Sequence, residues 1–143
     1  WVGDIIQVNP QLVETLWGKR ILPVVSPISS DSNGKSLNVN ADWAAAQLAI
    51  ALRAENLLLF TDVPGVLRDP SNPDSLIQNL SASEIPLLVQ KGIVSGGMIP
   101  KLKMIQTILQ GGVEEIFIAG GASLEFLDQL LGGKFVPGTR ITR

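Results

Sequence analysis

Residues 56–67 have the sequence NLLLFTDVPGVL, which predicts a buried strand and the turn that ends it. The apolar side chains from Leu57 to Phe60 follow one another without the alternation of a half-exposed strand. Such a run is typical of a strand that is covered on both faces of a parallel sheet. Pro64 and Gly65 then end the strand sharply. Because parallel strands are joined by helical crossovers, this stretch indicates an α/β fold.

The segments before this strand predict two helices with a hairpin between them. Asn9 followed by Pro10 is typical of an N-cap with proline at the first helical position, and Asn40 can cap the second helix. Asn33-Gly34 is the strongest short hairpin signal in the chain. The expected elements are a short strand over 4–8, a helix from Pro10 to Trp17, an edge strand over 21–28, a hairpin returning through 37–39, and a helix over 42–53.

The segments after the strand alternate between helices and strands. Ser81 and Glu84 fit a capping box, which would start a helix that Gly92 closes. This alternation predicts βαβ units in one domain, with an α/β layered sheet. The other expected elements are a surface loop over 68–76, a glycine-rich loop over 93–100, a helix over 101–110, a strand over 115–119, a helix over 123–131 and a short strand over 140–142.

The composition excludes several classes of function. Eleven basic and 13 acidic side chains give a net charge of −2, without the basic runs that nucleic acid or an anionic membrane would require. Cysteine and histidine are both absent, which excludes disulfides, cysteine nucleophiles, Ser-His-Asp triads and imidazole metal ligands. The longest apolar stretch, residues 43–52, is too short to span a bilayer. Without a charged signal-peptide start or an initial Met, we expect an intracellular fragment.

Two segments combine small polar side chains with an expected cleft. Thr61 to Val66 follow the buried strand, and ligands of open α/β sheets collect at the carboxyl ends of strands. The alternative is an ordinary strand exit. Asn38 and Asp42 lie at a predicted helix start, where simple capping is an equally good explanation.

Lys101 follows the glycine-rich loop at the start of a predicted helix, where the macrodipole disfavours a cation. The position makes sense if exposed amides and the ammonium bind a phosphate there, and a solvated lysine is the alternative. Gly34-Lys35-Ser36 looks like the end of a P-loop, but Ser29 stands where that motif needs glycine. Together these segments predict a cleft that handles phosphate groups, without naming the phosphoryl acceptor.

At these same residues the chain resembles the C-terminal part of the N-acetylglutamate kinases, a branch of the amino-acid kinase family. Residues 2–9 match a family segment as well, so the resemblance covers practically the whole chain. It implies a three-layer αβα sandwich with a mainly parallel sheet, of which residues 1–143 are the C-terminal ATP-binding lobe. The motifs that carry it are Asn38 to Asp42, Leu58 to Leu67, Gly97 to Lys101 and Pro137 to Ile141.

The resemblance also implies transfer of the γ-phosphoryl group of MgATP to the side-chain carboxylate of N-acetyl-L-glutamate, a cytoplasmic step of arginine biosynthesis. Carried over by position, Asn38 would contact the acetylated substrate, Asp42 would orient the catalytic lysines, and Lys101 would neutralise charge on the transferring group. Mg²⁺ would be held mainly through the nucleotide, without a metal site of its own. The residues that would hold the nucleotide are Asp62, Val63, Pro64, Gly65, Val66, Leu67, Ile93, Val94 and Ser95.

The chain also departs from the family pattern. In the family the N-terminal half carries a glycine-rich phosphate loop, a second catalytic lysine and a substrate-binding arginine, and this sequence contains none of these. We therefore expect little or no kinase activity from the chain alone. We also expect an uncovered apolar surface that favours a homo-oligomer. An aminoadipate-type or other amino-acid kinase and a non-catalytic nucleotide-binding module remain as alternatives.

Overall fold

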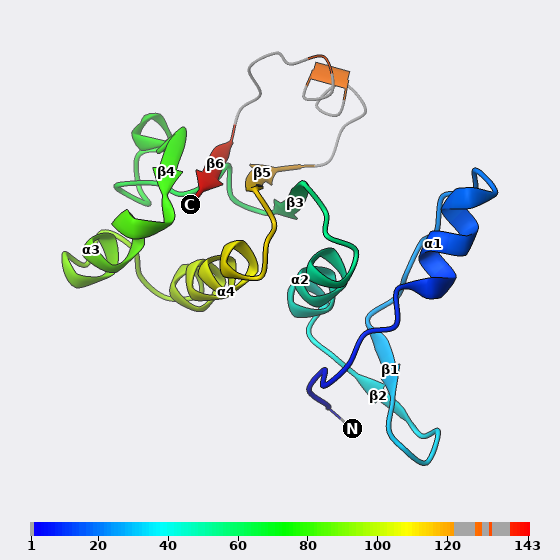
Figure 1. The fold of residues 1–143 in the computed structure, drawn as a ribbon. Helices are drawn as coiled ribbons and strands as arrows, with labels where there is room; N and C mark the ends of the chain where they lie inside the picture. Colours follow the sequence, from blue (N-terminus) through cyan, green and yellow to red (C-terminus); the bar gives the residue numbers. More distant parts are fainter. Residues whose placement is uncertain (1, 122–127, 130–131, 133–137) are drawn as a thin grey trace. The chain divides into compact units, whose positions relative to one another are not determined.

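The strand expected at residues 56–61 forms one edge of a four-stranded sheet in a computed structural model of the chain (Figure 1). The structure describes residues 2–121, 128–129, 132 and 138–143. The chain forms two compact units, residues 1–54 and residues 55–143. Within the described ranges, no helix has both the length and the apolar character that a membrane crossing requires.

The first unit contains the two helices and the hairpin that the sequence predicts. Its elements are α1 (Gln11–Gly18), β1 (Ile28–Ser30), β2 (Ser36–Asn38) and α2 (Ala41–Ala51). The Asn9 side chain accepts a hydrogen bond from the Gln11 amide at 3.0 Å, and that of Asn40 accepts one from the Trp43 amide at 3.0 Å. Asn40 is therefore the N-cap of α2, as predicted, whereas the N-cap position of α1 is Pro10, one residue after the predicted Asn9.

The hairpin is confirmed, whereas the two strands expected beside it are wrong. β1 and β2 pair antiparallel, and Gly34 between them has φ +79°. Residues 4–8 are not a strand, and of residues 21–28 only Ile28 is in one. Pro23 and Pro27 lack the amide hydrogen that a sheet ladder requires, which limits this segment to a short strand after the second proline.

The second unit is built on a mixed, mainly parallel sheet, which confirms the predicted α/β class. Its strands are β3 (Asn56–Thr61), β5 (Glu115–Gly120), β6 (Thr139–Thr142) and β4 (Asn79–Ser81), in that spatial order. β3 pairs parallel with β5, and β4 pairs parallel with β6. β5 and β6 pair antiparallel and join the two parallel pairs.

β3 is less buried than its apolar sequence predicts. Leu59 is 4% exposed, but Phe60 is 37% exposed. Among the described strands β3 has a neighbour on one side only, because it lies at the edge of the sheet. Its apolar run therefore marks a strand correctly, but not one covered on both faces.

Two helices of this unit are α3 (Ile85–Gln90) and α4 (Met98–Gln110), and short 3₁₀ turns η1 (Pro73–Ser75) and η2 (Ala82–Glu84) precede α3. The capping box is confirmed, since the Ser81 amide donates to the Glu84 carboxylate at 2.9 Å. α4 begins at Met98 rather than at Lys101. Pro100 fits its first turn because amides there need no partner within the helix. The helix expected over 123–131 lies outside the described residues, apart from 128–129.

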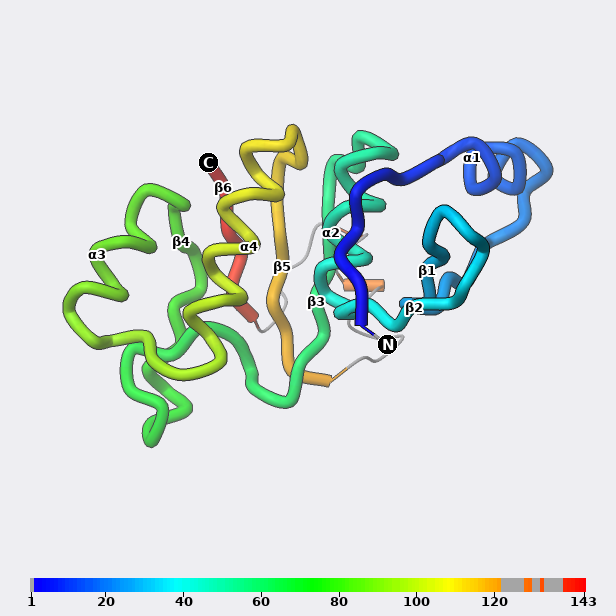
Figure 2. Tube along the Cα trace, turned by 90° about the horizontal axis from the view of Figure 1, so that it is seen from below, coloured from blue at the N-terminus to red at the C-terminus, as the bar shows by residue number. Residues whose placement is uncertain are grey.

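The apolar core of the second unit lies between α4 and the sheet. α4 runs alongside β5, as the tube in Figure 2 shows. Its buried side chains recur at helical spacing and face the inward side chains of β5 and β6. The fully buried set includes Leu102, Ile105, Ile108, Leu109, Ile116, Ile118 and Ile141. This packing fixes the first turn of α4 with respect to the carboxyl end of the parallel strands.

Candidate nucleotide pocket

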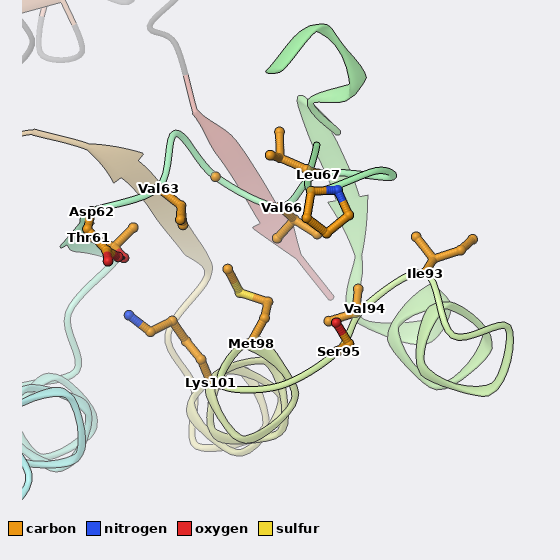
Figure 3. Close-up of a pocket in the computed structure, with 13 residues that line it drawn as sticks. Thr61, Asp62, Val63, Val66, Leu67, Ile93, Val94, Ser95, Met98 and Lys101 are labelled. Carbon is orange, nitrogen blue, oxygen red and sulfur yellow. The ribbon is translucent and has the colours of Figure 1, made fainter. Parts of the chain in front are cut away.

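A pocket of about 420 Å³ lies within the second unit, where β3 ends and α4 begins. Three segments form it: the end of β3 with the turn after it, the loop after α3, and the first turn of α4 (Figure 3). Its lining residues are Thr61, Asp62, Val63, Gly65, Val66, Leu67, Pro70, Ile93, Val94, Ser95, Gly97, Met98 and Lys101.

The residues predicted to hold the nucleotide all line this pocket, with the exception of Pro64. Pro64 lies instead against the end of β5, where a Cβ added to Gly120 would come within 3.1 Å of the Pro64 Cα. Lys101, predicted to act on the phosphoryl group, lines the pocket as well. The fold thus brings two separate sequence motifs to one place, and their roles there stay predictions.

Asn38 and Asp42 belong to the first unit. Asn38 is the last residue of β2, and Asp42 lies in the first turn of α2. The first unit has a pocket of its own, of about 360 Å³, which is lined from 5–9, 25–29 and the start of α2. Asn38 and Asp42 do not line that pocket, although their neighbours Val39 and Ala41 do.

The charged groups of the nucleotide pocket come from opposite walls. Asp62 follows the last residue of β3, and its carboxylate accepts a hydrogen bond from the Thr61 hydroxyl at 3.0 Å. Lys101 extends from α4 toward Thr61 and Asp62 in Figure 3. Apolar side chains, among them Val63 and Met98, make up much of the remaining wall. This combination suits a ligand with an apolar ring system and an anionic group.

The start of α4 does not offer the exposed amides that the sequence predicts. The Met98 amide donates to the Ser95 carbonyl, and the Ile99 amide donates to the Gly96 carbonyl, both at 3.3 Å. Pro100 has no amide hydrogen to offer. Lys101 is also the fourth helical residue rather than the first. Its side-chain ammonium, rather than amides of the first helical turn, therefore carries the positive character of this wall.

The turn after β3 is fastened to the sheet at Val66. The Val66 amide donates to the Thr139 hydroxyl at 2.8 Å, and the Val66 carbonyl accepts from the Ile77 amide at 2.8 Å. Gly65, with φ +152°, lies so close to β6 that a Cβ there would come within 2.6 Å of the Thr139 hydroxyl. A glycine is therefore required for this turn to approach β6.

Four lining residues were missed as site residues: Thr61, Pro70, Gly97 and Met98. Three of them lie inside motifs already named from the sequence, Leu58 to Leu67 and Gly97 to Lys101, but were given no role of their own there. Pro70 is different, because it lies in the loop over 68–76, which the sequence predicts only as surface. The position of Pro70 at the pocket depends on how that loop folds, and no local sequence pattern indicates that.

Two titratable groups, on the sheet surface and in the loop over 68–76, have shifted pKa values. Arg140 on β6 pairs through two nitrogens with Glu115 on β5, and this hydrogen-bonded carboxylate raises the pKa of the guanidinium. Arg140 therefore forms part of the surface of the sheet. In the loop over 68–76, the Ser71 hydroxyl and amide donate to Asp69 and lower the pKa of that carboxyl.

Comparison with known proteins identifies relatives of both the sequence and the fold. Residues 1–120 match the model of the amino acid kinase family. The acetylglutamate kinase of Heliobacterium modesticaldum is 46% identical over 121 residues, 85% of this chain and 41% of that protein. The chain thus spans less than half the length of this curated relative.

Two solved structures share the fold. The N-acetylglutamate synthase of Neisseria gonorrhoeae, complexed with coenzyme A and N-acetyl-glutamate, has a TM-score of 0.87 and 25% identity over 100% of this chain and 32% of its own. The carbamate kinase of Giardia lamblia, bound to AMP-PNP, has a TM-score of 0.67 and 25% identity over 92% of this chain and 43% of its own. The similarity therefore extends to proteins with different reactions, so the fold alone does not name a substrate.

Proposed function

Since this chain belongs to the amino acid kinase family, we propose that it supplies the nucleotide site of an ATP-dependent kinase. Relatives named acetylglutamate kinase support a kinase function. We further propose that the phosphoryl acceptor is the side-chain carboxylate of N-acetyl-L-glutamate, a cytoplasmic step of arginine biosynthesis. The 46% identity to a kinase of that name supports this choice of acceptor. An aminoadipate-type kinase is the nearest alternative within the family.

The observation that carries the proposal is the pocket at the end of β3. Its volume of about 420 Å³ is within the range of small-molecule sites. Apolar side chains suit the base, and Lys101 from α4 suits the phosphates. AMP-PNP, bound by the carbamate kinase with the same fold, is a ligand of this chemical class. The pocket therefore fits ATP and ADP better than an uncharged ligand.

Asp62 is the single carboxylate among the described residues that line the pocket. Magnesium at nucleotide sites typically uses one or two carboxylates together with the phosphates. Mg²⁺ would therefore be held mainly through the nucleotide, and Asp62 would supply the one carboxylate from the described lining residues. When bound with ATP, it would neutralise phosphate charge during transfer.

The remaining roles follow from the demands of phosphoryl transfer, which depends on positioning and electrostatic stabilisation rather than on a covalent protein nucleophile. Lys101 would neutralise charge on the transferring group. Asp42 would orient catalytic lysines, and Asn38 would hold the acceptor. This division of labour requires no histidine or cysteine, and the chain has neither.

Calorimetric titration with MgADP tests the nucleotide site directly. We expect saturable binding by the wild-type chain. Asp62→Ala should bind MgADP about tenfold more weakly, or worse, because the carboxylate that we propose lies beside the Mg²⁺ of the nucleotide is lost. Asp74→Ala is the matched control, since Asp74 is an exposed aspartate that does not line the pocket. A folded wild-type chain that binds no MgADP, or an Asp62→Ala chain that binds it equally well, contradicts the proposal.

A non-catalytic nucleotide-binding module is the second candidate, because the chain covers only 41% of the Heliobacterium modesticaldum acetylglutamate kinase. An ADP-release assay with N-acetyl-L-glutamate separates the two. We expect little or no turnover from this chain alone, and robust turnover would contradict that expectation. Running the same assay with an aminoadipate derivative tests the choice of acceptor whenever turnover is detected.

We also propose that the chain self-associates. Large apolar side chains are exposed on the first unit, with Ile6, Leu22 and Val24 among them. Exposed apolar surface of this kind favours association. Light scattering coupled to size-exclusion chromatography should give a mass above that of one chain, and a strictly monomeric profile would contradict the proposal.

A further inference from the structure

Thr139 is a buried polar residue whose side chain serves a distant part of the chain. It is the first residue of β6, it is fully buried, and its hydroxyl accepts from the Val66 amide at 2.8 Å. The two residues are 73 positions apart in the sequence. Val66 lines the nucleotide pocket (Figure 3). The hydrogen bond therefore joins β6 to the pocket wall.

The contact depends on close backbone approach on both sides. A Cβ on Gly65 would come within 2.6 Å of the Thr139 hydroxyl, and one on Gly138 would come within 2.6 Å of the Ile118 carbonyl oxygen. Both glycines have positive φ, +152° and +155°. Two glycines therefore allow the turn after β3 and the start of β6 to lie against the same part of the sheet.

Val66 is held from two directions. Its amide donates to Thr139, and its carbonyl accepts from the Ile77 amide at 2.8 Å. Ile77 lies just before β4, which pairs with β6 beside Thr139. Two hydrogen bonds from one corner of the sheet thus fix both polar groups of a single pocket residue. The backbone at Val66 is therefore held in place, and this also restrains the adjoining Gly65 and Leu67.

We propose that Thr139 is a positioning residue for nucleotide binding, and that it acts through its hydrogen bond to Val66. The proposal rests on the proposed function, since it assumes that the pocket binds MgADP. Without the hydroxyl acceptor, the buried Val66 amide would lose its partner, and the turn would move away to satisfy it. Such a movement would displace Gly65, Val66 and Leu67, which form the part of the pocket wall that we expect to contact the nucleotide.

Substitution of Thr139 separates the hydroxyl from the packing of the side chain. Thr139→Val keeps the shape and removes the acceptor, whereas Thr139→Ser keeps the acceptor. Ile141→Val is the matched control, because Ile141 is also fully buried on β6 but is not hydrogen-bonded to the turn. Each chain is examined by backbone amide hydrogen exchange, by calorimetric titration with MgADP and by thermal unfolding.

For Thr139→Val we expect exchange at the Val66 amide to be at least about tenfold faster and the Kd for MgADP to be about tenfold higher. Thr139→Ser should restore both, and Ile141→Val should lower the melting temperature while leaving both unchanged. If Thr139→Val does not fold, Thr139→Ala against Thr139→Ser makes the same comparison of chains with and without the hydroxyl.

Two results overturn the positioning role while the proposed function stands. One is unchanged exchange at Val66 in Thr139→Val, and the other is faster exchange with an unchanged Kd. A third result is different in kind: if the folded wild-type chain does not bind MgADP, the proposed nucleotide site is wrong and the positioning role fails with it. The exchange measurement still shows in that case whether the hydrogen bond forms.

Discussion

The two units of the chain differ in how they use apolar side chains. In the second unit, Ile105, Ile116 and Ile141 are fully buried between α4 and the sheet. In the first unit, Ile6 is 99% exposed and Val24 is 95% exposed. A hydrophobic segment contributes to stability only where a second layer covers it, because the free energy gain follows the apolar area removed from water.

The predicted functional roles are also divided between the two units. The residues expected to hold the nucleotide lie in the unit with the large core, whereas Asn38, expected to contact the acceptor, and Asp42, expected to orient catalytic lysines, lie in the other. Nucleotide binding can therefore be tested apart from the acceptor.

Truncation of isoleucine should strongly destabilise the second unit and leave the stability of the first almost unchanged. Ile116→Ala removes a fully buried side chain of β5 and should lower the free energy of unfolding by about 2–5 kcal/mol, through lost burial and the cavity that remains. Ile6→Ala makes the same change at an exposed position and should alter it by less than about 0.5 kcal/mol. Urea unfolding followed by circular dichroism measures both. Similar losses in the two variants would contradict the comparison.

Lys101→Met should weaken MgADP binding about 10- to 100-fold, because a charge-assisted contact to phosphate is lost while the side-chain length is kept. Lys103→Met is the control, since Lys103 is an exposed residue of the same helix that does not line the pocket. Calorimetric titration measures both affinities. Equal weakening by the two variants would mean that overall charge, rather than the pocket, attracts the nucleotide.

Removal of the α2 cap tests the first unit on its own. Asn40→Ala leaves the Trp43 amide without its side-chain acceptor and should lower the stability of this helix by about 1 kcal/mol. All three tryptophans of the chain lie in the first unit, so tryptophan fluorescence follows its unfolding specifically. Asn40→Asp should restore the midpoint because aspartate caps equally well. An unchanged midpoint in Asn40→Ala would show that the cap adds nothing there.

The smallest effect concerns Asp69 in the loop over 68–76. Its pKa lies below the ordinary value because the Ser71 hydroxyl and amide donate to the carboxylate. These bonds therefore favour the folded loop above the ordinary pKa of aspartate and are lost as the pH falls through the lowered value. Ser71→Ala should raise the pKa of Asp69, as carboxyl NMR titration would show. An unchanged pKa of Asp69 in Ser71→Ala would contradict the hydrogen bond as the cause of the lowered value.

Local patterns predicted the elements whose ends are set by neighbouring residues. The Asn40 cap and the Ser81–Glu84 capping box are present as predicted, because each depends on contacts within a few positions. The strand over 21–28 was predicted wrongly, since β-branched side chains favour a strand but the segment lacks a partner for most of its length among the described residues. Pairing is a tertiary property, and composition does not reveal it.

The features of the candidate site likewise divide into those that the sequence predicted and those that it did not. Asp62 and Lys101 were predicted from a strand exit and a glycine-rich loop, and both line the pocket. Pro70, three residues after Leu67, was missed because the sequence predicts its loop only as a surface loop. The amides at the start of α4 were expected to be exposed, but turn contacts from Ser95 and Gly96 engage them.

The sequence by itself determined the family, the α/β class and the two motifs that meet at the end of β3, because these depend on residue types at short spacing. Only the tertiary structure decided which apolar segments are buried and how the pocket wall is held. The hydrogen bond between Val66 and Thr139 joins residues 73 positions apart. Its formation depends on how β4 and β6 pair, and no local pattern encodes such pairing.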